Sequence, residues 1–203
     1  MIANIIGLMI RPKSQWQVIA EKDEFSLFSA CLYTAIFACL PAFAWYYGTT
    51  VVGWTVGDGD TTRLTSESAA TITVLFYLCM VASVCAIGYM MHWMSETYSA
   101  GAANVSSVAK CISIASFTAT PLFIVGAIGF IPVLWVSLVL GVLAACYAVY
   151  LLYLGIPIVM GISKERGFLY ASAVIAFCLV LIIVIMGGSV IAWDMGAAPS
   201  FTD

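Results

Sequence analysis

The long apolar segment from Val108 to Met160 is the feature that most restricts how this chain folds. A lipid bilayer has a hydrocarbon core of about 30 Å, which a helix of roughly 20 apolar residues crosses. At about 1.5 Å of rise per residue, one helix over the whole segment would be more than twice as long as that core is thick. The segment must therefore fold back, and Gly126, Gly129 and Pro132 are the turn-forming residues near its middle. We expect a tight turn at 130–133 between two antiparallel spans.

Three further apolar blocks are long enough to cross a membrane: Leu27 to Tyr47, Ala69 to Trp93 and Phe168 to Trp193. The chain is 64% hydrophobic and only 8% charged, which is more apolar surface than a water-soluble fold of 203 residues encloses. These observations predict an all-α integral membrane protein with a bundle of five transmembrane helices. The predicted spans are about 27–47, 69–93, 108–130, 133–159 and 168–193, within one domain covering 27–203.

The basic residues predict how the bundle is oriented. Six of the seven lie on one side of the predicted spans, and only Arg63 lies on the other. Cytoplasmic loops of membrane proteins retain an excess of Lys and Arg. The N-terminus is therefore expected in the cytoplasm and the C-terminus outside. The six residues on the expected cytoplasmic side are Arg11, Lys13, Lys22, Lys110, Lys164 and Arg166.

Residues 1–26 are expected to form short helices that lie at the cytoplasmic membrane interface. Ile2, Ile5, Ile6 and Met9 recur at helical spacing, as in a helix whose apolar edge is turned into lipid. After Pro12, which suits the first turn of a second helix, Trp16 and Ile19 share one helical face. We interpret this second helix as a membrane-surface helix and not as a ligand site.

The loop after the first span is expected to form a small extracytoplasmic β-hairpin. Val52, Trp54 and Val56 alternate with smaller residues, and a Gly-Asp-Gly-Asp sequence then interrupts the pattern. Asp58 and Asp60 are interpreted as turn residues because a Ca²⁺ site needs six to eight oxygen ligands and no other acidic cluster is nearby.

Catalysis is not indicated. The middles of the five predicted spans contain no Asp, Glu, Lys, Arg or His, and no hydrolase, zinc-protease or phosphate-binding motif occurs. The seven cysteines lie inside apolar runs without metal-ligand spacing, so they are interpreted as small buried hydrophobic residues. We therefore expect no enzymatic activity, no metal and no cofactor. The cysteines are Cys31, Cys39, Cys79, Cys85, Cys111, Cys146 and Cys178.

A polar seam is predicted between the third and fourth spans. Ser113, Ser116 and Thr120 follow one helical face, and Tyr147 and Tyr150 lie one turn apart on the neighbouring span. Hydroxyl pairs between membrane helices contribute on the order of 1 kcal/mol each, so the seam is suited to holding helices together. A polar cavity for a solute is the alternative interpretation.

A second group of polar residues is expected at the cytoplasmic ends of the spans, where lipid headgroups lie. His92 and Glu96 share a helical face there, although two ligands alone do not make a zinc site. The complete candidate headgroup cluster is His92, Glu96, Lys110, Lys164 and Arg166.

Four segments together resemble the bacterial branch of the Yip (Ypt/Rab-interacting protein) family. They are Pro12-x-x-x-Trp16-x-x-Ile19, Gly48-Thr49-Thr50-x-x-Gly53-Trp54-x-x-Gly57-Asp58-Gly59, Ala119-Thr120-Pro121-Leu122-Phe123 and Tyr150-Leu151-Leu152-Tyr153-Leu154-Gly155-Ile156-Pro157. The resemblance implies five spans and a location in the bacterial inner membrane. Eukaryotic relatives bind prenylated GTPases through a longer cytoplasmic region with an Asp-Leu-Tyr-Gly-Pro motif. That motif does not occur here, so GTPase binding is not carried over.

The favoured function is a non-enzymatic membrane-organising or adaptor role. The expected partners are membrane lipids, with other membrane proteins or a second copy of the chain as further candidates. The alternative is a small permease or channel that uses the polar seam, and a third hypothesis is a membrane enzyme acting at the cytoplasmic cluster. Nucleic acid is not an expected partner because the net charge is -3 and the seven basic residues are scattered.

Overall fold

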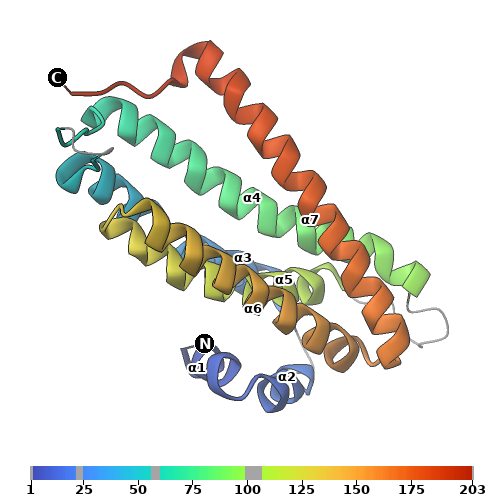
Figure 1. Ribbon diagram of the computed structural model, residues 1–203. Helices are drawn as coiled ribbons and strands as arrows, with labels where there is room; N and C mark the ends of the chain where they lie inside the picture. Colours follow the sequence, from blue (N-terminus) through green and yellow to red (C-terminus); the bar gives the residue numbers. More distant parts are fainter. Residues whose placement is uncertain (1, 22–24, 56–59, 99–106, 203) are drawn as a thin grey trace.

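The computed structural model describes residues 2–21, 25–55, 60–98 and 107–202, with side chains described for residues 5–95 and 107–202 of these ranges (Figure 1). Two short helices come first and five long ones follow. Three of the long helices continue into a short π-helical or 3₁₀ turn: η1 (Gly48–Val52), η2 (Gly126–Phe130) and η3 (Trp193–Ala197). The α-helices are α1 (Ile2–Ile10), α2 (Pro12–Ala20), α3 (Leu27–Tyr47), α4 (Ser66–Tyr98), α5 (Val108–Val125), α6 (Leu134–Met160) and α7 (Lys164–Ala192).

Five helical segments are long and apolar enough to cross a membrane, which confirms the predicted number of spans. They are Leu27–Val52, Ser66–Ser95, Val108–Phe130, Leu134–Met160 and Lys164–Ala197. The chain folds back inside the long apolar segment as expected. There, η2 tightens the end of α5, and the Val133 amide donates to the Ile131 carbonyl at 2.7 Å before α6 begins.

The most buried of the five long helices is α5, which packs against α3, α4 and α6. The first half of α7 is bonded to its neighbours: the Tyr170 hydroxyl donates to the Met91 carbonyl of α4, and the Tyr153 hydroxyl of α6 lies 2.9 Å from that of Ser172. Beyond Leu179 most side chains of α7 are exposed and apolar. Such a helix is suited to lipid contact over its second half.

The helices α1 and α2 lie against the side of the bundle formed by α5 and α6, away from α4 and α7 (Figure 1). Pro12 occupies the first turn of α2, where its missing N–H is not needed. Trp16 and Ile19 share a face of α2, and both are fully buried against the bundle. The second helix therefore packs at a specific position on the bundle. We call this buried contact of Trp16 and Ile19 with the bundle the seat of α2.

The backbones of α3 and η2 approach each other closely through glycines. A Cβ atom added at Gly48 would lie 1.9 Å from the Gly129 carbonyl oxygen, and one added at Gly126 would lie 2.4 Å from Pro41 Cβ. Small residues permit this kind of close approach between membrane helices. The first span is thereby fixed to the turn that joins the third and fourth.

The predicted β-hairpin is wrong, because no β-strand forms within the described residues. Instead of starting an extended arm, residues 49–52 continue α3 as the turn η1, where the hydroxyls of Thr49 and Thr50 donate to helix carbonyls. Among the described residues of the loop, the antiparallel bridge of Trp54 with Thr62 and the hydrogen bond from the Leu64 amide to the Thr49 carbonyl join its two halves. Val56 and Asp58 lie outside the described residues.

The second half of this loop pairs with the C-terminal tail. Leu64 forms a bridge with Phe201, the Thr65 amide donates to the Ser200 carbonyl at 2.9 Å, and the Thr202 amide donates to the Arg63 carbonyl at 2.9 Å. Alternation of apolar residues indicated extended backbone but not the identity of its partner. The tail therefore supplies the hydrogen bonds that a hairpin would have supplied locally.

Candidate functional site

The three hydroxyl residues of the predicted seam are buried on α5, and two of them bond to α3. Thr120 Oγ1 lies 2.7 Å from the hydroxyl of Tyr33, and Ser116 Oγ lies 2.7 Å from Thr34 Oγ1. Ser113 donates to the Ala109 carbonyl of its own helix at 2.8 Å. The polar contacts therefore connect the first and third spans.

In this α3–α5 seam, the donor of each hydrogen bond follows from the single proton that each hydroxyl carries. Thr120 Oγ1 donates to the Ser116 carbonyl at 3.1 Å, so the Tyr33 hydroxyl is left to donate to Thr120. Thr34 and Ser116 each lie within hydrogen-bonding distance of a carbonyl one turn earlier, at 3.1 and 2.7 Å. Since each hydroxyl has one proton, one of these two gives up its carbonyl bond when it donates to the other. The seam has no spare donor to offer a solute.

The tyrosines predicted to face this seam lie elsewhere. Tyr147 of α6 donates to the Leu8 carbonyl of α1 at 2.8 Å and lies 3.3 Å from the Met9 carbonyl oxygen. The Tyr150 side chain is 49% exposed, and its ring centre is 5.8 Å from that of Tyr147. The structure thus separates the five predicted seam residues into an α3–α5 group and an α1–α6 group.

An aromatic cluster that the sequence pattern did not reveal joins α2 to the seam. The Phe117 ring centre lies 6.5 Å from that of Trp16 and 5.1 Å from that of Tyr33, both edge-on. The Trp16 ring also packs on Gly155 of α6, where an added Cβ would lie 2.6 Å from a ring carbon. In the sequence, Gly155 of the Tyr-Leu-Gly-Ile-Pro segment was the available sign of a close contact. The sequence did not show that Trp16 makes this contact, because Trp16 lies far away along the chain.

The residues of the predicted headgroup cluster lie at the ends of three helices, α4, α5 and α7. His92 of α4 is half-buried with its ring centre 6.5 Å from that of Tyr89, and Lys110 Nζ of α5 lies 5.9 Å above the Phe25 ring. Lys164 and Arg166 are exposed in the first turn of α7, and the Glu96 side chain lies outside the described residues. Within the described part of the chain, no three His, Cys, Asp or Glu side chains gather as metal ligands.

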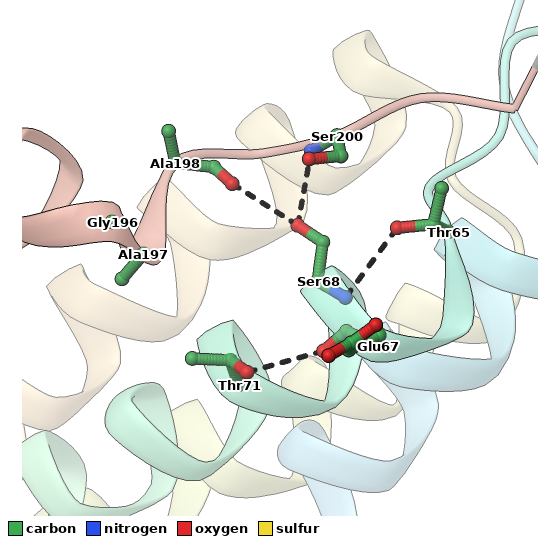
Figure 2. Close-up of a pocket in the computed structure, with 8 residues that line it drawn as sticks. All are labelled: Thr65, Glu67, Ser68, Thr71, Gly196, Ala197, Ala198 and Ser200. Atoms are coloured by element: carbon green, nitrogen blue, oxygen red, sulfur yellow. Dashed lines mark hydrogen bonds between the residues drawn. The ribbon is translucent and has the colours of Figure 1, made fainter.

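A small polar pocket of about 190 Å³ lies at the opposite ends of the spans, between the start of α4 and the C-terminal tail (Figure 2). Ser68 holds its two walls together, because its hydroxyl donates to the Ala198 carbonyl at 3.2 Å and accepts the Ser200 amide at 3.0 Å. Glu67 and Thr71 complete the wall formed by α4. The polar groups that line the pocket mainly hydrogen-bond the C-terminal tail to the start of α4.

The comparison with protein families rests on nearly the whole chain. The model of the Yip1 domain matches residues 6–185. The chain belongs to the Yip1 domain family. The resemblance seen in the sequence is thereby confirmed.

Two curated relatives share most of their length with this Yip1 protein. Each is named inner membrane protein YohC, one from Escherichia coli strain K12 and one from Escherichia coli O6:H1 strain CFT073. Each is 32% identical over 195 residues, which cover 96% of this chain and 98% of the relative. No solved structure matches the chain.

The Yip1 match includes the seat of α2 and the α3–α5 seam but not the tail. Trp16, Tyr33, Thr120 and Gly155 all lie within residues 6–185, whereas the tail residues of the polar pocket follow that range. The buried contacts therefore belong to the Yip1 domain, and the pocket involves a segment outside it.

The bond between Tyr33 and Thr120 is tested by a double-mutant cycle. We expect Tyr33→Phe and Thr120→Val each to lower the free energy of unfolding, with a coupling energy of about 0.6–1 kcal/mol for the pair, as for other hydroxyl bonds in membranes. Reversible unfolding in detergent measures each value. The matched control pairs Tyr33→Phe with Ser189→Ala, since Ser189 lies near the end of α7 and its hydroxyl donates to the Met186 carbonyl of its own helix. Equal coupling in both cycles would contradict the assignment.

Proposed function

We propose that this Yip1 protein is a non-enzymatic inner-membrane protein that organises the membrane or recruits partners through its exterior. The observation that carries the proposal is the closed α3–α5 seam. Its hydroxyls are buried and bonded to each other or to helix carbonyls. A solute pathway would need these polar groups to line an open cavity. The geometry therefore gives the permease alternative no support and leaves the outer surface as the working surface.

The outer surface is well suited to lipids and to other membrane helices. Side chains of α4, α6 and α7 expose large apolar groups along much of each helix, among them Val74, Leu143 and Ile183. Lipid chains and apolar partner helices are the surroundings that such faces tolerate. We propose lipids as the first class of partner, with other membrane proteins or a second copy of the chain as further candidates.

The basic residues support an orientation with the N-terminus in the cytoplasm. Lys110, Lys164 and Arg166 lie near the ends of spans on the side where α3 begins, and Arg63 lies on the other side. The name of the relatives adds support for the inner membrane as the location. Labelling of a cysteine placed at Lys164 from the periplasm of intact cells, with a cysteine at Arg63 as the comparison site, would contradict this orientation.

Extraction of the protein in native lipid with a membrane-solubilising polymer tests the function. We expect mass spectrometry to detect a reproducible set of retained lipids or a cross-linked membrane protein. In proteoliposomes we expect no solute flux above that of empty vesicles. Absence of both lipids and partners would contradict the proposal, and flux that is lost in Thr120→Val would restore the permease alternative.

A further inference from the structure

The hydrogen bond between α6 and α1 indicates how deeply the N-terminal helices lie. Tyr147 is the central residue of α6, which runs from Leu134 to Met160. A helix of that length measures about 40 Å and therefore crosses the hydrocarbon core completely, with its centre near the middle of the bilayer. Tyr147 donates to the carbonyls at the C-terminal end of α1. That end of α1 consequently lies near mid-membrane depth and not at the surface.

The second helix runs back towards the side where α3 begins. The Trp16 ring of α2 packs on Gly155, which is two turns closer to the end of α6 than Tyr147. Phe25 and Leu27 then follow at the start of α3. The chain therefore leaves α2 towards the side where α3 begins, with the junction of α1 and α2 inside the bilayer half on that side.

Several backbone carbonyls at this junction accept hydrogen bonds from the protein. The carbonyl of Gly7 accepts the Arg11 amide at 2.7 Å, and that of Arg11 accepts the Gln15 amide at 3.1 Å and the Ser14 hydroxyl at 3.0 Å. The carbonyls of Leu8 and Met9 are reached by Tyr147, as described above. Helix-end carbonyls in water need no protein partner, whereas in hydrocarbon each unsatisfied group costs several kcal/mol. Pro12 also removes one amide donor from the junction.

The side chains of α1 form one buried face and one exposed apolar face, as expected for a helix that lies between protein and acyl chains. Ile5 and Leu8 are buried against the bundle, whereas Ile6 and Ile10 are exposed, Ile10 at 71%. On α6, Leu143 is likewise exposed one turn from Tyr147. Arg11 and Lys13 are exposed and long enough to extend their charges towards the headgroups on the same side.

We propose that α1 and α2 are inserted together into one leaflet, the one on the side where α3 begins. The exposed face of α1 contacts the acyl chains of that leaflet, and Arg11 and Lys13 extend towards its phosphates. This inference deepens the proposed function by naming the lipid contact. It replaces the expected surface position of α1 and α2 with an inserted one. The pair displaces lipid from a single leaflet, which gives the protein a means of bending or thinning its membrane.

Depth-dependent fluorescence quenching tests the insertion. A fluorescent amino acid replaces Ile10 in the full chain, reconstituted in phosphatidylcholine and phosphatidylglycerol vesicles. The vesicles carry nitroxides either at the headgroup or near the end of the acyl chain. Matched probes at Leu143 and Val18 mark mid-span depth and the returning helix. We expect the deep nitroxide to quench the Ile10 probe about twofold more than the headgroup nitroxide, because the core half-thickness separates the two labels. The Ile10 ratio should match that of Leu143.

Stronger quenching of the Ile10 probe by the headgroup nitroxide would overturn the insertion and leave the lipid-retention test of the proposed function unaffected. The Tyr147→Phe variant adds a second measurement, because it removes the bond that holds the end of α1. We expect the Ile10 probe to become shallower in this variant while the Leu143 probe keeps its depth. An unchanged Ile10 depth in Tyr147→Phe would show that this bond does not hold α1 in place, and would also count against the proposal.

Discussion

The Gly48→Ala variant is expected to lose about 3 kcal/mol of stability, at the upper end of the usual cost of overpacking. The added methyl group would lie 1.9 Å from the carbonyl oxygen of Gly129 and 3.0 Å from its carbonyl carbon. Both atoms belong to the backbone, so no side-chain rotation relieves the contact. Relief requires α3 and η2 to move apart, which also disturbs the neighbouring contact between Gly126 and Pro41. Equilibrium unfolding in detergent, followed by circular dichroism, measures the loss.

Gly141→Ala is the matched control for this variant. Gly141 lies inside α6, and a Cβ added there would have no atom within 4 Å. Alanine favours a helix over glycine by about 1 kcal/mol, so this variant is expected to be neutral or slightly more stable. Equal stabilities of the two variants would show that the contact between α3 and η2 is looser than described.

Trp16→Ala is expected to have the second large effect, a loss of about 3–5 kcal/mol from the seat of α2. Trp16 is fully buried and contacts both Gly155 and Phe117, so its removal leaves a large void. Since Trp16 and Ile19 are the buried residues of α2, we expect the loss to appear first as detachment of α1 and α2. Hydrogen exchange of the amides of α2 in detergent or nanodiscs measures that detachment directly.

Two tryptophan variants separate loss of this seat from a general effect. Trp135 at the start of α6 is 72% exposed, so Trp135→Ala should leave exchange in α2 unchanged. Trp16→Phe should keep most of the seat, because Trp16 Nε1 has no hydrogen-bond partner among the described residues and its loss leaves no broken bond. Slow exchange of α2 in Trp16→Ala would mean that other contacts hold the helix.

The five spans were predictable because length and apolarity act locally. A block such as Phe168 to Trp193 has to be a helix in lipid wherever its neighbours lie, since only its own carbonyls can satisfy its amides. The fold-back near Pro132 followed from the same length argument. These predictions needed no knowledge of tertiary contacts.

The partners of the buried polar residues were not predictable in this way. The spacing of Ser116 and Thr120 placed them on one helical face, but the face turned towards Tyr33 and Thr34 of α3 and not towards α6. Likewise, the shared face of Trp16 and Ile19 indicated an apolar contact. Whether lipid or protein supplied that contact depended on Gly155, which lies far along the chain. Pairing between distant segments is set by the packing of the whole bundle.

The tail that pairs with the loop before α4 has a consequence for biogenesis. Leu64 emerges from the ribosome long before Phe201, and their bridge brings together residues on the same side of the membrane. The loop therefore has no partner until the fifth helix has been inserted and the tail lies on the same side of the membrane as the loop. Closure of this bridge follows insertion of the fifth helix, so it marks a molecule whose last span is in place.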